Sequence, residues 1–111
     1  MAAEARAVGI NAERILILEK GRAHSWAIRK FYPEAKAVLA NYKGIDAICT
    51  GVMCISDMTK EETLSYLDRA IDENELMVHY DEAVQTIRPV ADGSFFVDTN
   101  AGSYQTRRCI A

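Results

Sequence analysis

The hydrophobic residues of the chain gather in short runs that predict alternating helices and strands. Four consecutive aliphatic residues at positions 15–18 predict a short strand buried on both faces, as strands of parallel sheets are. The alanine-rich residues 2–9 before it predict a helix that ends at Gly9, because alanine favours helices and glycine often follows their last turn. A second strand at residues 76–79 is expected to return parallel to the first through a crossover connection.

The clearest predicted helix lies between these two strands, at residues 59–74. Thr59 and Glu62 have the spacing of a capping box, in which each side chain binds a backbone N–H group at the start of the helix. Apolar residues three and four positions apart form one stripe, so we expect one face of this helix to pack against a sheet. Residues 34–42 predict a further short helix, and residues 48–55 predict extended or irregular chain.

The last third of the chain alternates apolar and polar residues and predicts strands. Two triplets that favour turns, at residues 91–93 and 100–102, each end in glycine and separate three short strands. We expect these strands to form an antiparallel meander over about residues 83–105. Residues 107–111 predict the beginning of a further apolar strand. Together the patterns predict an α/β fold with a small antiparallel sheet.

Composition narrows the class of protein. The 111 residues suit one domain or a piece of one, and the net charge of −3 gives no reason to expect binding to nucleic acid or to an anionic membrane. No apolar run approaches the roughly 20 residues of a membrane span, and the N-terminus does not have the pattern of a signal peptide. The three cysteines are an odd number, so we expect a reducing, cytoplasmic location.

Two of the cysteines raise a separate question about redox or metal chemistry. Cys49 and Cys54 have the C-x4-C spacing of the redox pair in one branch of disulfide reductases, but the glycines that flank that pair are missing here. We therefore expect buried structural thiols at these positions. The two histidines of the chain are distant in sequence, so we predict no metal site.

Glu19 carries the most informative chemistry. It stands at the end of the first aliphatic strand, and ligands of open α/β sheets bind outside the carboxyl ends of the strands. In dinucleotide-binding folds an acid about 20 residues after a glycine-rich turn binds a ribose hydroxyl. Glu19 has the right place for that role, although no G-x-G-x-x-G occurs in the chain. The other interpretation is a solvated residue at the end of a strand.

The order of elements resembles the FAD-binding domain of two-dinucleotide-fold flavoproteins, which include thioredoxin-reductase-like and flavin-monooxygenase-like proteins. The resemblance is nearest to the bacillithiol-disulfide-reductase-like group, through residues 19–21 (Glu-Lys-Gly), 24–25 (His-Ser), 57–59 (Asp-Met-Thr) and 93–97 (Gly-Ser-Phe-Phe-Val). It implies a partial Rossmann-like FAD-binding domain over residues 1–111. The family's first strand and its G-x-G-x-x-G loop would precede this chain, so we expect a domain truncated at both ends.

The resemblance implies six cofactor-binding residues: Glu19, Lys20, Gly21, Ala83, Val84 and Ala111. Glu19 matches the acid that binds the adenosine ribose, and the two residues after it follow at the edge of the cofactor. Ala83 and Val84 match the position whose backbone brackets the adenine. Ala111 matches the start of the segment that passes near the flavin. No catalytic residue and no metal ligand is assigned.

The implied function is that of an FAD-dependent, NAD(P)H-using oxidoreductase of which this chain holds the adenosine end of FAD. NAD(P)H would be the co-substrate of a second domain that is absent from this chain and is its expected partner. The chain alone is expected to be inactive, and a homodimer is a further possibility. Two alternatives stay open, namely a complete small α/β domain that binds a partner without a cofactor, and an NAD-only Rossmann protein.

Overall fold

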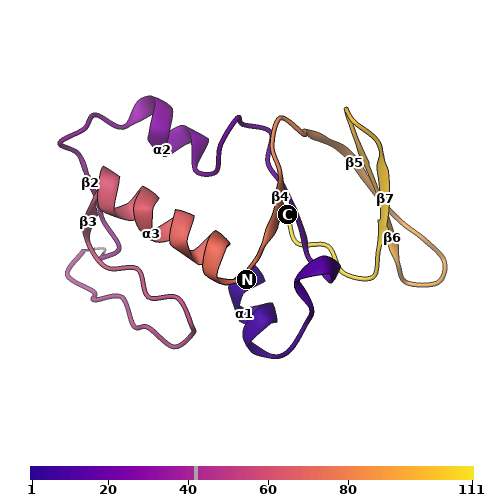
Figure 1. The fold of residues 1–111 in the computed structure, drawn as a ribbon, viewed down its shortest axis with the longest axis horizontal. Helices are drawn as coiled ribbons and strands as arrows, with labels where there is room; N and C mark the ends of the chain where they lie inside the picture. Colours follow the sequence, from indigo (N-terminus) through magenta and orange to yellow (C-terminus); the bar gives the residue numbers. More distant parts are fainter. Residues whose placement is uncertain (42) are drawn as a thin grey trace. The chain divides into compact units, whose positions relative to one another are not determined.

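The structure is a computed structural model that describes residues 1–41 and 43–111. The chain forms two compact units (Figure 1). We call the first, Met1–Ile17 with Ser25–Met77, the helical unit, and the second, Leu18–His24 with Val78–Ala111, the meander unit. Each is described by itself below. None of the helices in the described parts of the chain is long and apolar enough to cross a membrane.

The helical unit begins with the predicted N-terminal helix, α1 (Ala2–Ala7). Gly9 follows it with a φ of 95°, a backbone conformation that glycine adopts without a steric penalty. A short 3-10 helix, η1 (Ala12–Arg14), then leads to the first strand. The Arg6 guanidinium fastens α1 within the unit, because it donates to the carbonyl of Asn74 at 2.9 Å and lies 3.2 Å from a carboxylate oxygen of Glu75.

The longest element is α3 (Lys60–Glu73), and its start is the predicted capping box. The Glu62 N–H donates to Thr59 Oγ1 at 3.1 Å, and the Thr59 N–H donates to Glu62 Oε2 at 2.8 Å. The apolar stripe is half-buried while the acidic positions around it are exposed, as the pattern predicted. Lys60 is buried at the start of the helix, where its Nζ donates to the Tyr32 carbonyl and to a carboxylate oxygen of Glu34.

The predicted helix over residues 34–42 is wrong for the part that the structure describes, and Tyr42 lies outside the described residues. The helix of this region comes earlier, as α2 (Trp26–Phe31). It ends before Pro33, because a proline holds the residue before it in extended backbone. Two short strands follow, β2 (Ala37–Val38) and β3 (Met58–Thr59), and they pair antiparallel. This pairing between distant positions outweighs a local preference for helix.

The described residues between β2 and β3 have little regular structure, as predicted for residues 48–55. Cys49 and Cys54 lie in this segment, form a disulfide and are both exposed. The prediction of buried structural thiols is therefore wrong. Irregular chain at the surface has no packed layer in which to bury a thiol, and the sequence pattern did not reveal the pairing. The third cysteine, Cys109, is a half-buried free thiol.

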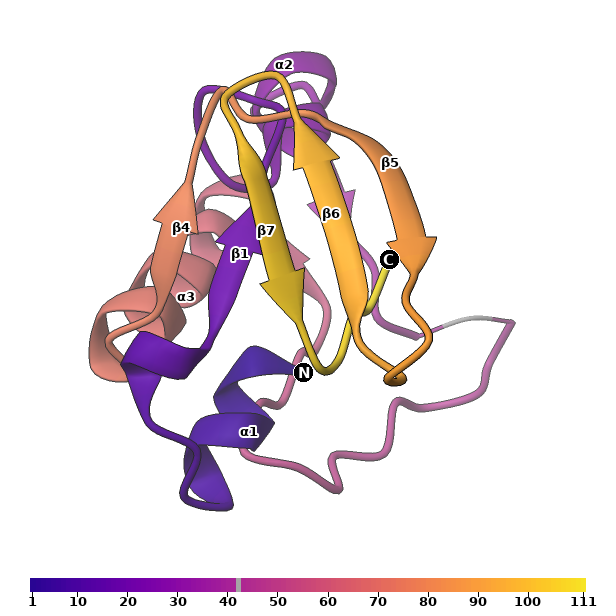
Figure 2. The same cartoon turned by 90° about the vertical axis from the view of Figure 1, so that its right-hand side faces the viewer.

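The two predicted parallel strands are present as β1 (Leu16–Leu18) and β4 (Met77–His79), and they form a two-stranded sheet. Figure 2 shows both arrows pointing the same way. The residues of β1 are half-buried, and they were expected to be buried on both faces. Among the described residues β1 pairs with β4 alone, so its other edge lacks the second neighbour that a central strand of a parallel sheet has.

The meander unit contains the predicted antiparallel sheet, in the order β5 (Val84–Pro89), β6 (Phe95–Thr99), β7 (Ser103–Thr106) (Figure 2). Val97 on the central strand pairs with Ile87 on one side and Tyr104 on the other, and it is buried. Residues 107–111 do not form the predicted strand. A strand needs a hydrogen-bonded neighbour, and no described segment pairs with these residues.

Candidate nucleotide-binding site

The loop after β1 holds Glu19 in a defined position. The Glu19 N–H donates to the carbonyl of His79 at 2.9 Å, which continues the pairing of β1 with β4. The Gly21 N–H turns back and donates to Glu19 Oε1 at 2.7 Å. A carboxylate oxygen can accept hydrogen bonds from the hydroxyl groups of a ligand, and Oε2 of this half-buried residue is the oxygen that the Gly21 bond does not use. Lys20 next to it is exposed and Gly21 is buried.

The structure brings the second predicted segment next to this loop. The Glu82 N–H donates to the Glu19 carbonyl, and the Asp81 N–H donates to the Gly21 carbonyl, both at 3.0 Å. Residues 19–21 and 81–82 therefore lie side by side within the meander unit, and Ala83 and Val84 follow directly in the chain. Five of the six predicted site residues thus belong to these two adjoining segments, at the carboxyl ends of β1 and β4. That is the edge at which open α/β sheets bind ligands.

Asn100 fixes the backbone of Ala83. Its side-chain oxygen accepts from the Ala83 N–H at 2.8 Å, and its own backbone N–H donates to the Ala83 carbonyl at 3.2 Å. The Asn100 amide nitrogen also donates to the Asp81 carbonyl. With its N–H engaged, Ala83 offers a ligand van der Waals contact rather than a hydrogen-bond donor. The turn between β6 and β7 thus holds the strand start at Val84 in place.

Ala111 is the predicted residue that the structure does not bring to this place. It is exposed, lies outside the strands, and shares no hydrogen bond with the other candidates among the described residues. The physical reason is the one given for residues 107–111: these residues have no neighbouring strand that would fix their direction.

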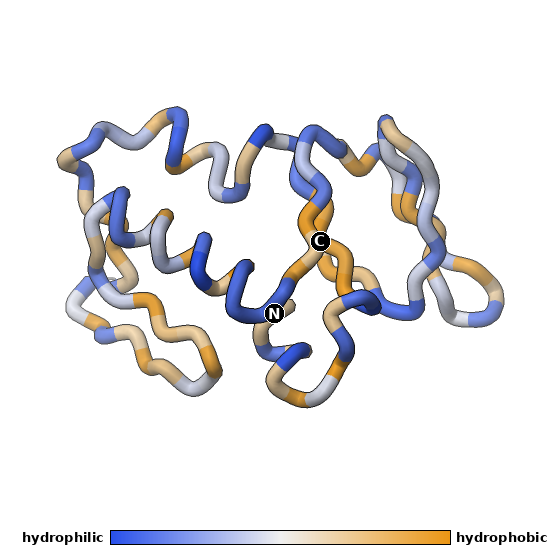
Figure 3. Tube along the Cα trace, in the orientation of Figure 1, coloured by the Kyte–Doolittle hydropathy of each residue, from blue (hydrophilic) through white to orange (hydrophobic). Residues whose placement is uncertain are grey.

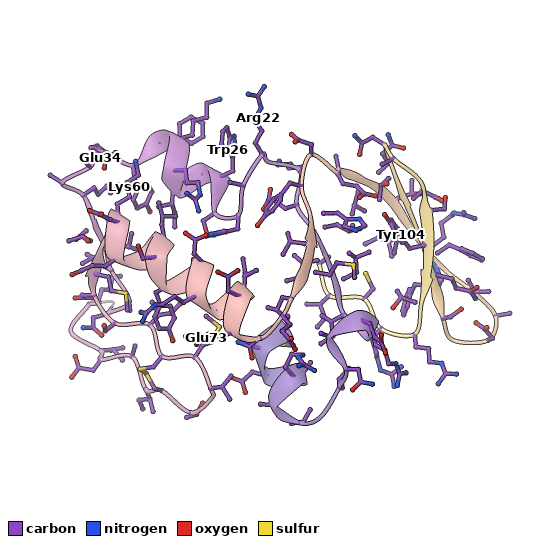
Figure 4. The ribbon with its side chains drawn as sticks, viewed as in Figure 1. Arg22, Trp26, Glu34, Lys60, Glu73 and Tyr104 are labelled. Carbon is purple, nitrogen blue, oxygen red and sulfur yellow. A yellow bond between two sulfur atoms is a disulfide. The ribbon has the colours of Figure 1, made fainter. Side chains whose placement is uncertain are left out.

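Glu82, next to Ala83, is a buried carboxylate that the sequence analysis did not predict. Glu82 is only 5% exposed. Its Oε1 accepts from Thr99 Oγ1 and from the Tyr104 hydroxyl, each at 2.7 Å, and its Oε2 lies 3.0 Å from His79 Nδ1. Figure 4 labels Tyr104 on β7, from which it reaches this group. We call these four residues (His79, Glu82, Thr99 and Tyr104) the Glu82 cluster.

The hydrogen bonds of the cluster favour the ionised carboxylate. The Tyr104 hydroxyl, and after it the Thr99 hydroxyl, hold the pKa of Glu82 below its ordinary value, with a smaller contribution from His79. The same bond raises the pKa of the Tyr104 hydroxyl, because it stabilises the protonated phenol. The cluster joins the end of β4 to β6 and β7. It therefore positions residues 81–84 beside the Glu19 loop.

Sequence reasoning could have found only half of this cluster. His79 and Glu82 are three positions apart at the end of a predicted strand, which is a visible signal. Thr99 and Tyr104 lie 17 and 22 positions further on, and their approach depends on the register of the meander. The His79 ring has a hydrogen-bond partner in Glu82, and its side chain is 40% exposed.

Two grooves lie elsewhere in the described residues. No group of three or more histidine, cysteine or acidic side chains among them could hold a metal ion. One groove of about 380 Å³ lies along α3, where Lys60 and Glu34 form an ion pair (Figure 4). Another, of about 570 Å³, lies at the turn before β6 and ends at Arg107 and Arg108. Neither groove is lined by the six predicted residues.

Comparison with known protein families gives a match over the whole chain. Residues 1–111 match the family described as pyridine nucleotide-disulphide oxidoreductase. The chain belongs to this family. No curated protein matches the chain.

Two solved structures show how this family member compares in three dimensions. Bacillithiol disulfide reductase Bdr (YpdA) from Staphylococcus aureus is 22% identical with a TM-score of 0.68, over 96% of this chain and 31% of that one. The enzyme of the same name from Bacillus cereus is 20% identical with a TM-score of 0.66, over 96% of this chain and 33% of that one. The chain thus spans about a third of the length of these structures. The likeness confirms the predicted α/β fold, with a partial Rossmann-like arrangement of strands and helices.

Proposed function

We propose that this chain is the FAD-binding part of an NAD(P)H-dependent flavoprotein oxidoreductase and holds the adenosine end of FAD. The observation that carries the proposal is the Glu19 carboxylate at the carboxyl end of β1, with one oxygen bound to the Gly21 N–H. An acid at this point of a dinucleotide-binding fold binds the ribose hydroxyls. Membership of the pyridine nucleotide-disulphide oxidoreductase family supports the same chemistry.

The roles of the remaining site residues follow from their places. Lys20 and Gly21 would lie at the edge of the adenosine, with Gly21 shaping the loop that carries Glu19. Ala83 and Val84 would border the adenine, and they begin where residues 81–82 bond to that loop. Ala111 would lie toward the flavin. When bound, the flavin supplies the hydride and electron chemistry, while the protein binds and orients it. Nothing in the described residues suggests an acid, base or nucleophile for this reaction.

The proposal extends to the protein that contains this chain. The chain aligns with about a third of the length of two longer reductases. This supports a longer protein in which an NAD(P)H-binding domain is the partner of the 111 residues. On this view the 111 residues alone have no oxidoreductase activity, and a homodimer is one possible assembly of the whole protein. We also propose a cytoplasmic location for the whole protein, as the odd number of cysteines in this chain indicated.

The experiment is to purify the longest protein encoded around this sequence and to record its absorption spectrum. The expected result is the flavin spectrum, with FAD identified by mass after the protein is denatured. Addition of NADH or NADPH under anaerobic conditions should bleach that spectrum. A colourless protein whose spectrum and thermal stability do not change when FAD is added would contradict the proposal.

A further inference from the structure

The groove at the turn before β6 is lined by none of the residues of the proposed nucleotide site. Its volume of about 570 Å³ is within the range of roughly 300–1,000 Å³ that small-molecule sites in proteins have. Its walls come from the turn between β5 and β6 and from the chain that leaves β7. Because Phe95 pairs with Thr106, these two segments lie at the same end of the sheet (Figure 2). The whole groove therefore belongs to the meander unit.

Two adjacent arginines line the groove, Arg107 and Arg108, and both are exposed. Figure 3 shows the blue of hydrophilic residues where the chain leaves β7. Arg108 Nη1 donates to the Arg107 carbonyl at 3.0 Å, and Thr106 Oγ1 donates to the Arg108 carbonyl at 2.9 Å. These bonds fix the turn that carries both arginines. A guanidinium has about five N–H donors, and the bond from Arg108 uses one of them.

The turn before β6 contributes one carboxylate to the groove, that of Asp92. The N–H and the hydroxyl of Ser94 donate to Asp92 Oδ1 at 2.9 and 2.6 Å, and Gln105 Nε2 donates to the Ser94 hydroxyl at 3.0 Å. The two bonds from Ser94 hold the pKa of Asp92 below its ordinary value, with a smaller contribution from Arg107. Ser94 is buried, so it holds an ionised acceptor in one position.

The charges of the groove select the chemistry of a ligand. Two arginines against one aspartate give an excess of positive charge, although the chain as a whole has a net charge of −3. Guanidinium groups bind phosphate oxygens in pairs, and a phosphate monoester offers about three oxygens and nearly two negative charges at neutral pH. The Asp92 carboxylate repels an anion but accepts a hydrogen bond from a hydroxyl group. A ligand that suits both ends of the groove has a phosphate and a hydroxyl.

We propose that this groove binds a small phosphate monoester that carries hydroxyl groups. The phosphate lies on the guanidinium groups of Arg107 and Arg108, and a hydroxyl donates to the Asp92 carboxylate. Sugar phosphates and the headgroups of phosphorylated lipids share this chemistry. The inference does not rest on the proposed FAD function, because the groove is lined by other residues.

The first test observes the groove directly, by NMR of the isotope-labelled full-length protein. Glycerol phosphate is added at neutral pH, and the Nε–Hε signals of Arg107 and Arg108 and the amide signal of Ser94 are followed. We expect these signals to shift and to saturate. Because they report on the groove alone, phosphate groups bound elsewhere in the protein do not affect the result. Signals that stay in place, or that drift without saturating, would overturn the proposal.

The second test separates a phosphate site from general attraction between charges. Arg107→Lys together with Arg108→Lys keeps both positive charges and removes the planar forks. We expect about a tenfold or larger loss of affinity for glycerol phosphate, since charge-assisted hydrogen bonds are lost. Arg14→Gln, at an exposed arginine of η1, is the control and should bind like the wild type. A lysine variant that binds as tightly as the wild type would show that the arginines form no specific site.

The third test concerns the hydroxyl of the ligand and its source. The wild type should bind glycerol phosphate more tightly than methyl phosphate, and Asp92→Asn should lose this preference while it keeps an acceptor for Ser94. Equal affinity of the wild type for the two esters would refute the role of Asp92. Phosphatidylcholine vesicles with and without phosphatidylinositol phosphate distinguish the sources. Sedimentation with the phosphorylated vesicles alone supports a lipid headgroup, and binding of only the dissolved ester supports a sugar phosphate.

Discussion

The Glu19 carboxylate gives the sharpest prediction about cofactor affinity. Glu19→Ala removes both carboxylate oxygens, including the Oε1 acceptor of the Gly21 N–H, whereas Glu19→Gln keeps a neutral acceptor at Oε1. A hydrogen bond to a charged group is worth about 1.5–3 kcal/mol, which corresponds to a loss of affinity of roughly 10- to 150-fold. We expect a loss in this range for Glu19→Ala. The loss for Glu19→Gln should be smaller, because neutral bonds are roughly half as strong.

The assay compares two flavins in the full-length protein after its cofactor has been removed. FAD carries the adenosine that Glu19 is proposed to bind, whereas FMN lacks it. Both variants should therefore lower the affinity for FAD, measured by the quenching of flavin fluorescence, and leave the affinity for FMN unchanged. Glu13→Gln, an exposed glutamate of η1, is the matched control and should change neither affinity.

The comparison of flavins separates a binding contact from damage to the loop. If the affinities for FAD and FMN fall equally in Glu19→Ala, the residue supports the fold and does not bind the ribose. If Glu19→Ala binds FAD as tightly as the wild type, the reasoning about the end of β1 is refuted.

Three further predictions concern the chain itself. Because the folded-state pKa of Glu82 is lowered, the Glu82 cluster stabilises the fold above the unfolded-state pKa, near 4.5, and this contribution is lost as the pH falls through the lower folded-state pKa. In urea unfolding, the wild type should therefore be more stable than Glu82→Gln at higher pH, and this difference should shrink over that range. A difference in stability that is constant with pH would refute this. Thr59→Ala should destabilise α3 by about 1 kcal/mol, measured by circular dichroism, whereas Thr59→Ser should retain most of the stability. An equal loss of stability in the two variants would contradict the role of the capping box. The isolated chain should be marginally stable or self-associate, because the buried hydrophobic residues of its described part are Ala3 and Val97 and because β1 is paired on one side. A cooperative, monomeric unfolding transition at micromolar concentration would contradict this.

The parts of the fold that could be predicted are those whose signals are local. The capping box of α3 needs only Thr59 and Glu62, and the helix begins where these residues placed it. The turns of the meander were visible as glycine-ending triplets, and they separate β5, β6 and β7. The aliphatic run at residues 15–18 became β1, paired with β4 as expected.

The errors and omissions come from contacts between distant positions. Residues 34–42 carried a helical pattern, but Ala37 and Val38 pair with residues 58 and 59. The Glu82 carboxylate became a buried centre only because β7 brings Tyr104 to it. Pairing of Cys49 with Cys54 could be suspected from their spacing, but their exposure could not be read from the residues around them.

For the candidate site, the sequence was informative about chemistry and less so about geometry. Glu19 was predicted from its place after a strand, and the structure adds that Gly21 binds one of its oxygens. The two segments, residues 19–21 and 81–84, lie close together because of hydrogen bonds between their backbones, which no local pattern reveals.

The central claim is that the protein containing this chain holds FAD through Glu19 and its neighbours. The most direct test is the identity and amount of cofactor in the purified full-length protein, measured by absorption and by mass after denaturation. The account predicts FAD in near one-to-one amount, reducible by NADH or NADPH. A protein that is purified without flavin and does not bind added FAD would contradict it.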